Sequence, residues 1–349
     1  MKKNIIKAVC FTLILATVTF CVNYVLCWKD SLGIRQFYAM PKNTMDVIYF
    51  GSSHAEYGIN TAYQWDDYGI ASYSMTEGGQ NLGTTYYYMV EALKYQKPKV
   101  MVVEMTFTAP RWEFAGNGNS YVYRSIVNMR YSKNYIDNVK YGIDVANTRG
   151  ENPPYPDLWK YLVFKFPVYH TRYTDLHQTD FKIEKLERGR YEGSSVCVPQ
   201  TVSATIDYDE RCADGYDGIY RKEYVDKMIQ LCEDHDIQLV FWISPYECPE
   251  EDMQVFNTLS DYSAEHGIPF LNFSRSELQQ EIGFDYATDM IEDNHVNFDG
   301  CRKITNFFNQ YLVDSCGVQS HKGEDKYTIY QEIADYWNAW EVDLRAEGR

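Results

Sequence analysis

The sequence predicts an α/β fold with a mostly parallel sheet of about five strands, covered by helices on both faces. Short apolar strand candidates alternate with amphipathic helices, and this alternation is typical of parallel sheets. An apolar stretch at the amino terminus precedes the alternating pattern, and one long segment interrupts it.

The first 30 residues predict a membrane anchor. Lys2, Lys3 and Lys7 precede an uncharged stretch over residues 8–28, and roughly 20 apolar residues are enough to cross a bilayer. Basic residues stay on the cytoplasmic side, so we expect a single pass with the amino terminus inside and the rest of the chain outside the cytoplasm. A cleaved signal peptide and a buried amino-terminal helix are the alternatives, but no A-x-A-like cleavage site follows the apolar run.

The strands and helices of the sheet are placed by hydrophobic pattern. Strands are predicted at 47–50, 71–75, 100–103, 239–243 and near 270–271, and helices at 86–93, 224–232, 250–266 and 304–312. We expect one α/β domain over residues 31–324, with an insertion at 107–220 that lacks the strand–helix rhythm. A helical tail is expected over residues 325–349.

Composition excludes several classes of function. The formal net charge is −16, which repels phosphate backbones and argues against a nucleic-acid partner. Nine cysteines are present without a C-x-x-C pair, and no histidine pair has metal-ligand spacing, so neither a metal nor a cofactor is expected. Outside the cytoplasm some cysteines could form disulfides, and the sequence leaves their pairing open.

The first chemical motif is Gly51-Ser52-Ser53-His54, directly after the first strand. Sites in parallel sheets form beyond the carboxyl ends of the strands, where a glycine permits a tight turn and the next helix offers N–H groups to an oxyanion. Ser53 is therefore the candidate nucleophile, although the same residues also suit a helix N-cap. For His54 a structural role is expected.

The second motif surrounds His295, just before the helix at 304–312. A serine becomes nucleophilic when a base takes its proton, and a histidine base in turn needs a carboxylate. Glu292, three residues earlier, can fold back across a tight turn and is the expected acid; Asp293 and Asp289 remain alternatives. A solvated acidic loop with a surface histidine is the other interpretation.

Together these motifs resemble the SGNH hydrolases, also called GDSL-like hydrolases. Ser53 matches the nucleophile of their first block, and His295 matches the histidine of their last block, D-x-x-H, with Glu292 in place of the aspartate. Gly79 is the best match to the second-block glycine, whose N–H, with that of Ser53, binds the oxyanion. The third block, G-x-N-D, is replaced by Glu104-Met105-Thr106.

The resemblance covers about residues 44–106 and 222–313 and implies a three-layer sandwich with a flavodoxin-like sheet. A single anchor with an exported domain resembles the proteins of alginate and peptidoglycan O-acetylation and of teichoic acid D-alanylation, which act beside multi-pass membrane acyltransferases. This implies a serine esterase or O-acyltransferase that forms an acyl-enzyme on Ser53 and acts on a cell-surface glycan or related polymer.

Two alternatives remain open at this stage. One is a catalytically inactive relative that binds glycan or serves as a scaffold for a membrane acyltransferase, which the missing third block favours. The other is a hydrolase of small esters with no polymer partner. We also expect the insertion at 107–220 to cap the site, with Trp112, Tyr121 and Tyr123 lining an acceptor groove.

Overall fold

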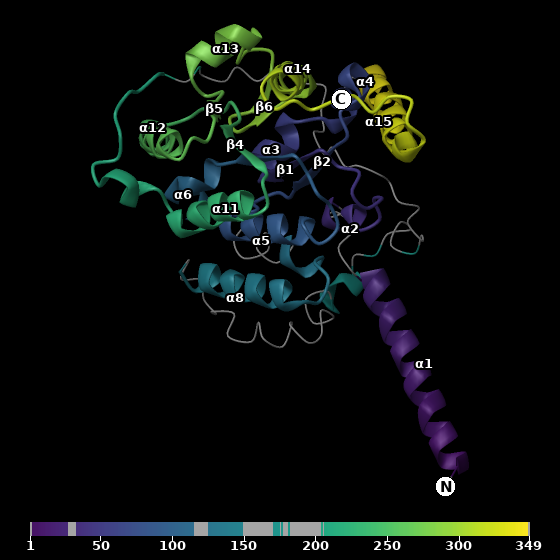
Figure 1. Ribbon diagram of the computed structural model, residues 1–349. Helices are drawn as coiled ribbons and strands as arrows, with labels where there is room; N and C mark the ends of the chain where they lie inside the picture. Colours follow the sequence, from purple (N-terminus) through teal and green to yellow (C-terminus); the bar gives the residue numbers. More distant parts are fainter. Residues whose placement is uncertain are drawn as a thin grey trace.

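The computed structural model describes residues 2–26, 33–114, 125–148, 170–174, 176, 181, 204 and 206–347. Its centre is a parallel sheet of five strands in the order β2-β1-β3-β4-β5 (Figure 1). The strands are β1 (Val47–Gly51), β2 (Ser72–Thr76), β3 (Val100–Glu104), β4 (Gln238–Ile243) and β5 (Phe270–Asn272). This is the flavodoxin-like strand order, and it confirms the predicted α/β class.

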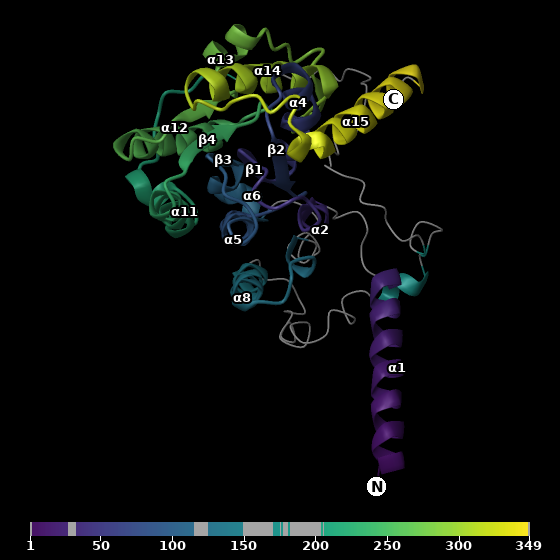
Figure 2. The same cartoon turned by 45° about the vertical axis from the view of Figure 1, so that its right-hand side comes forward.

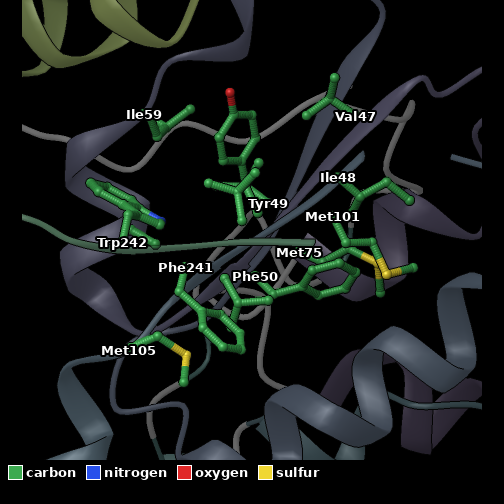
Figure 3. Close-up of a cluster of buried hydrophobic side chains, with 14 of the residues drawn as sticks. Val47, Ile48, Tyr49, Phe50, Ile59, Met75, Met101, Met105, Phe241 and Trp242 are labelled. Atoms are coloured by element: carbon green, nitrogen blue, oxygen red, sulfur yellow. The ribbon is translucent and has the colours of Figure 1, made fainter. Parts of the chain in front are cut away.

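The strands are apolar along their whole length because both faces of the sheet are covered. Tyr49 and Trp242 lie on one side of the sheet, and Phe50 and Phe241 lie on the other (Figure 3). Successive side chains of a strand point to opposite faces, so a strand covered on both faces needs an unbroken apolar run. Short apolar runs of this kind are the sequence pattern that predicts these strands.

Helices form a layer on each face of the sheet. Two of them, α5 (Leu82–Ala92) and α11 (Lys222–Asp234), cover one face. The other face is covered by α3 (Ser53–Gly58), α4 (Thr61–Tyr68) and α14 (Phe298–Asp314), and the tail helix α15 (Thr328–Glu347) packs on α4 (Figures 1 and 2). Two further helices, α12 (Glu250–Glu265) and α13 (Ser276–Ile282), flank β5 in the sequence.

The amino-terminal helix α1 (Lys2–Leu26) is long and apolar enough to cross a membrane. None of its most apolar window is buried in the domain, and the helix extends away from the sheet (Figure 2). A core helix of a soluble domain would bury one face, so the alternative of a buried amino-terminal helix is wrong. A short helix, α2 (Gly33–Phe37), then packs along the edge strand β2.

The described part of the insertion contains a helix that the hydrophobic pattern did not predict, α8 (Lys133–Thr148). It packs on the outer side of α5, where Thr84 Oγ1 donates a hydrogen bond of 3.0 Å to Asn138 Oδ1 (Figure 1). This part of the insertion therefore adds a layer over α5 and does not cap the carboxyl edge of the sheet as expected. Tyr121 and Tyr123 lie outside the described residues.

The structure describes seven cysteines. Cys10, Cys21, Cys212, Cys232 and Cys316 carry free thiols, and the other two are Cys248 and Cys301. Four of them are buried, and burial raises the pKa of the Cys232 and Cys248 thiols to about 12. A raised pKa keeps these thiols protonated and therefore unreactive, and the Cys248 thiol also donates a hydrogen bond of 3.4 Å to Tyr246 OH.

Candidate active site

The loop after β1 is shaped by Gly51. This residue has φ of 145°, and a Cβ placed on it would lie 2.6 Å from Cβ of Glu104 on the neighbouring strand β3. Both features require a glycine. Ser52 then caps α3 by accepting a hydrogen bond of 3.3 Å from the backbone N–H of His54. As a result Ser53 is the first residue of the helix, at the carboxyl edge of the sheet.

The second half of the site is a small hairpin formed by β6 (Met290–Glu292) and β7 (His295–Val296). The two strands are antiparallel, and Glu292 and His295 are paired in the register across a turn made by Asp293 and Asn294. Side chains of directly opposite residues lie on the same face of a hairpin. The hairpin therefore brings this carboxylate to the imidazole.

Ser53, His295 and Glu292 form one hydrogen-bonded chain. His295 Nε2 lies 2.8 Å from Ser53 Oγ, and His295 Nδ1 is hydrogen-bonded to Glu292 Oε1. Since a carboxylate can only accept, Nδ1 carries the proton, and the lone pair on Nε2 faces the serine hydroxyl. Partial burial works to raise the pKa of Glu292, but hydrogen bonds from His295 and Asn294 outweigh it and hold that pKa below its ordinary value.

The alternative acids are engaged elsewhere. Asp289 is buried, and its Oδ2 lies 2.6 Å from Lys303 Nζ and 2.7 Å from the backbone nitrogen of Asp285. The backbone oxygen of Asp293 accepts a hydrogen bond of 2.8 Å from Glu247 N, and its side chain is exposed in the turn. Glu292 is the acid that the structure places on His295.

Aromatic rings line the site around His295. The ring of Tyr57 lies 4.6 Å from that of His295, and the ring of His54 lies 5.4 Å from it. Trp112 stands edge-on to His54 at 4.7 Å, so this one expected cap residue does reach the site. Tyr57 was not predicted, although it follows Ser53 by four residues and residues at that spacing share a helix face.

Trp112 is held by a buried carboxylate. Oδ2 of Asp252 accepts hydrogen bonds from Trp112 Nε1 at 3.0 Å and Tyr246 OH at 2.6 Å, and it pairs with Arg111 Nε at 2.7 Å. Tyr246 also packs against His54, with ring centroids 5.3 Å apart. Asp252 therefore holds the two rings that pack against His54.

Glu104 occupies the end of β3, where the third sequence block is missing. Its Oε2 accepts a hydrogen bond of 3.1 Å from Ser52 Oγ, and its Oε1 accepts one of 2.8 Å from the backbone N–H of Thr106. Burial raises the pKa of Glu104 to about 7, against the opposing effect of these donors. The carboxylate thus ties the end of β3 to the residue that precedes Ser53.

Gly79 lies in the loop after β2. That loop leaves the sheet close to Ser53, since Thr76 pairs with Gly51 and the N–H of Glu77 donates to Gly51 O at 3.3 Å. Gly79 has φ of 67°, which favours glycine. Its backbone N–H remains the proposed oxyanion donor.

Comparisons with known proteins assign neither a family nor an activity to the chain. No protein-family model matches the chain, and no curated protein matches it in sequence. Among solved structures the chain is similar to the crystal structure of a candidate acylhydrolase from Bacteroides fragilis, at 11% sequence identity and a TM-score of 0.38. That likeness covers 81% of this chain and 94% of the other. A likeness at this level assigns no activity, so the chemistry rests on the geometry of the site.

Proposed function

We propose that the protein is a serine-dependent acyl ester hydrolase or O-acyltransferase that acts through an acyl-enzyme on Ser53. One observation carries the proposal: the hydrogen-bonded chain from Ser53 Oγ through both ring nitrogens of His295 to Glu292. A nucleophile, a base within hydrogen-bond reach and a third group that orients the base are the parts that acyl transfer by a serine requires.

Acylation follows from this arrangement. Ser53 Oγ attacks the ester carbonyl carbon as its proton moves to His295 Nε2. Glu292 stabilises the resulting imidazolium through Nδ1. The backbone N–H groups of Ser53 and Gly79 are the proposed donors to the negatively charged carbonyl oxygen. When the tetrahedral intermediate collapses, the C–O bond breaks and His295 returns the proton to the departing alcohol.

Deacylation repeats the same steps with a second hydroxyl. His295 removes a proton from the attacking oxygen, and Ser53 leaves with that proton. If the attacking group is water, the result is hydrolysis; if it is a hydroxyl of a second molecule, the acyl group is transferred. The active-site residues serve both outcomes, and the choice depends on which nucleophile the surrounding surface binds.

We further propose that the site lies outside the cytoplasm and that its substrate is a cell-surface glycan or related polymer, with a multi-pass membrane acyltransferase as partner. The apolar helix α1 and the basic residues at its start support the location. The chain contains 32 tyrosines, and aromatic rings such as Tyr57 beside His295 and Trp112 beside His54 suit contact with sugar rings.

A fluorophosphonate probe tests the nucleophile directly, because it forms a covalent bond with an activated serine. The full chain in detergent should be labelled, and peptide mapping should place the label on Ser53. Ser53→Ala should abolish labelling. Ser315→Ala, at an exposed serine beyond α14, should leave labelling unchanged. Labelling that persists in Ser53→Ala, or no labelling of the wild type, would refute an activated Ser53 and favour the inactive scaffold.

A second assay separates hydrolysis from transfer. The enzyme is given p-nitrophenyl acetate with and without an oligosaccharide, and free acetate and acetylated sugar are both measured. Acetylated sugar that depends on Ser53 identifies an O-acyltransferase. Free acetate alone, at a rate that the sugar does not change, identifies a small-ester hydrolase.

A further inference from the structure

His54 carries a buried ring nitrogen whose role the triad does not explain. The side chain is 2% exposed. Its Nδ1 lies 3.2 Å from Ser52 Oγ, whereas its Nε2 has no hydrogen-bond partner among the described residues. Buried polar atoms are nearly always paired. This orphaned nitrogen belongs to the residue next to the nucleophile, and its ring lies 5.4 Å from that of His295.

The hydrogen bonds around Ser52 determine which nitrogen of His54 carries the proton. The single hydroxyl proton of Ser52 is donated to Glu104 Oε2. Toward His54 the hydroxyl can therefore only accept, and it does so from both the backbone N–H and Nδ1. The chain Glu104–Ser52–His54 thus places a proton on Nδ1.

Nε2 of His54 is unprotonated and carries a free lone pair. Burial, the neighbouring His295 and the charge of Arg111 hold the pKa of His54 well below its ordinary value. The ring is therefore neutral, and a neutral imidazole has one proton, which is already on Nδ1. Nε2 is an acceptor, and its natural complement is an O–H or N–H group.

We propose that His54 Nε2 accepts a hydrogen bond from a hydroxyl group on the alcohol part of the ester substrate, which makes His54 a specificity-determining residue. The inference rests on the proposed function, because it assumes an ester bound at Ser53. His295 returns its proton to the leaving alcohol, so that part of the substrate lies beside His295, where His54 also lies. An alcohol with a second hydroxyl near the ester oxygen, as in a sugar or other polyol, fits this position.

His54 Nε2 is buried, so a substrate hydroxyl can reach it only when one of the neighbouring rings moves. Trp112 and Tyr246 both pack against the His54 ring, and Trp112 is the less buried of the two. Binding of the substrate hydroxyl at Nε2 therefore requires the Trp112 ring to leave its hydrogen bond with Asp252. The hydrogen bond then formed satisfies the orphaned acceptor, so a substrate that carries the hydroxyl gains affinity over one that lacks it.

The proton placement is tested by nitrogen NMR on the full chain in detergent with labelled histidine, at pH 8. His54 is assigned by comparison with His54→Gln. In the wild type, Nδ1 should be protonated and Nε2 bare. In Glu104→Gln the side-chain amide donates a hydrogen bond to Ser52 Oγ. The hydroxyl proton of Ser52 is then donated to His54 Nδ1. The proton of the His54 ring should therefore move to Nε2. A wild-type ring protonated on Nε2 would overturn the assignment.

The contact is tested with two esters of similar size, 2-hydroxyethyl acetate and propyl acetate. His54→Phe should lower kcat/KM for 2-hydroxyethyl acetate about tenfold more than for propyl acetate, the scale of one neutral hydrogen bond. His54→Gln, which restores an acceptor, should recover part of the loss. Equal losses with both esters would reduce His54 to a structural role, and no loss with either would also overturn the proposal.

The Ser53→Ala variant distinguishes a failure of the role inferred for His54 from a failure of the proposed function. In this variant the His54 Nε2 resonance should shift saturably with 2-hydroxyethyl acetate and not with propyl acetate. No selective shift overturns the role of His54, even if the wild type is an active esterase. Turnover that persists in Ser53→Ala overturns the proposed function, whatever the titration shows.

Discussion

Glu292 and His295 are cross-strand partners in the hairpin formed by β6 and β7, and this pairing places a carboxylate oxygen on His295 Nδ1. The other ring nitrogen faces Ser53 at 2.8 Å. Two residues form the turn between Glu292 and His295, and from this position the glutamate side chain reaches the imidazole.

Glu292→Gln should lower kcat by a factor of about 100 to 10,000 with little change in KM, because the amide cannot stabilise the imidazolium as a carboxylate does. The measurement is hydrolysis of p-nitrophenyl acetate. Asp293→Asn is the matched control, since it changes the adjacent exposed carboxylate and should leave kcat near the wild-type value. A glutamine variant with wild-type kcat would show that Ser53 and His295 act as a dyad.

Gly51→Ala should destabilise the fold by about 2 kcal/mol or more, because the backbone has φ of 145° and the new methyl group would meet Cβ of Glu104 at 2.6 Å. Thermal unfolding in detergent measures this loss. Gly267→Ala is the comparison, because Gly267 has φ of 66° with no neighbouring atom within 4 Å and therefore carries backbone strain alone. Equal losses at the two positions would contradict the close approach to Glu104.

The raised pKa of Glu104 predicts a pH dependence of stability. That pKa is about 7 in the folded chain against an ordinary value of 4.5, so between these values the folded state holds a proton that the unfolded state releases. The free energy of unfolding then falls as pH rises from 4.5 to 7, by roughly 3 kcal/mol for the full shift.

The Glu104→Gln variant has no titrating group at this position, so comparing it with the wild type isolates the contribution of Glu104 to the pH dependence of stability. Between pH 5 and pH 8 the wild type should lose thermal stability relative to the variant, with most of the change complete by pH 7. Unfolding curves recorded in the same detergent at several pH values provide the comparison. If the two proteins keep a constant difference across this range, Glu104 does not titrate there.

The orientation of the anchor is tested by protease added to intact cells, which should digest the domain beyond residue 30. A cytoplasmic protein monitored in the same sample confirms that the cells stay intact. Digestion only after lysis would place the domain inside and remove the proposed access to surface polymers.

The parts of this molecule that follow local rules were predictable from the sequence. The strands were found because each is a short apolar run between polar segments, as in residues 47–50. Glu292 was selected over Asp289 and Asp293 by its spacing from His295, and the hairpin has the geometry that this spacing requires. A carboxylate three residues before a histidine is a local relationship.

What escaped prediction depends on contacts between distant segments. Glu104 meets Ser52 only because β3 lies beside β1, and nothing near Glu104 in the sequence indicates that pairing. The helix α8 was missed because its buried residues, such as Tyr135 and Val145, are interspersed with polar ones that include a buried asparagine bonded to α5. Its partner surface exists only in the folded domain.

The short connection between α1 and α2 limits where the domain can act. Leu26 ends the first helix and Gly33 begins the second, which already packs on the sheet edge. Residues 27–32 can span at most about 20 Å when fully extended. If α1 spans the bilayer as we propose, the domain stays tethered close to the membrane surface. The proposed acceptors must then come close to the membrane to meet Ser53.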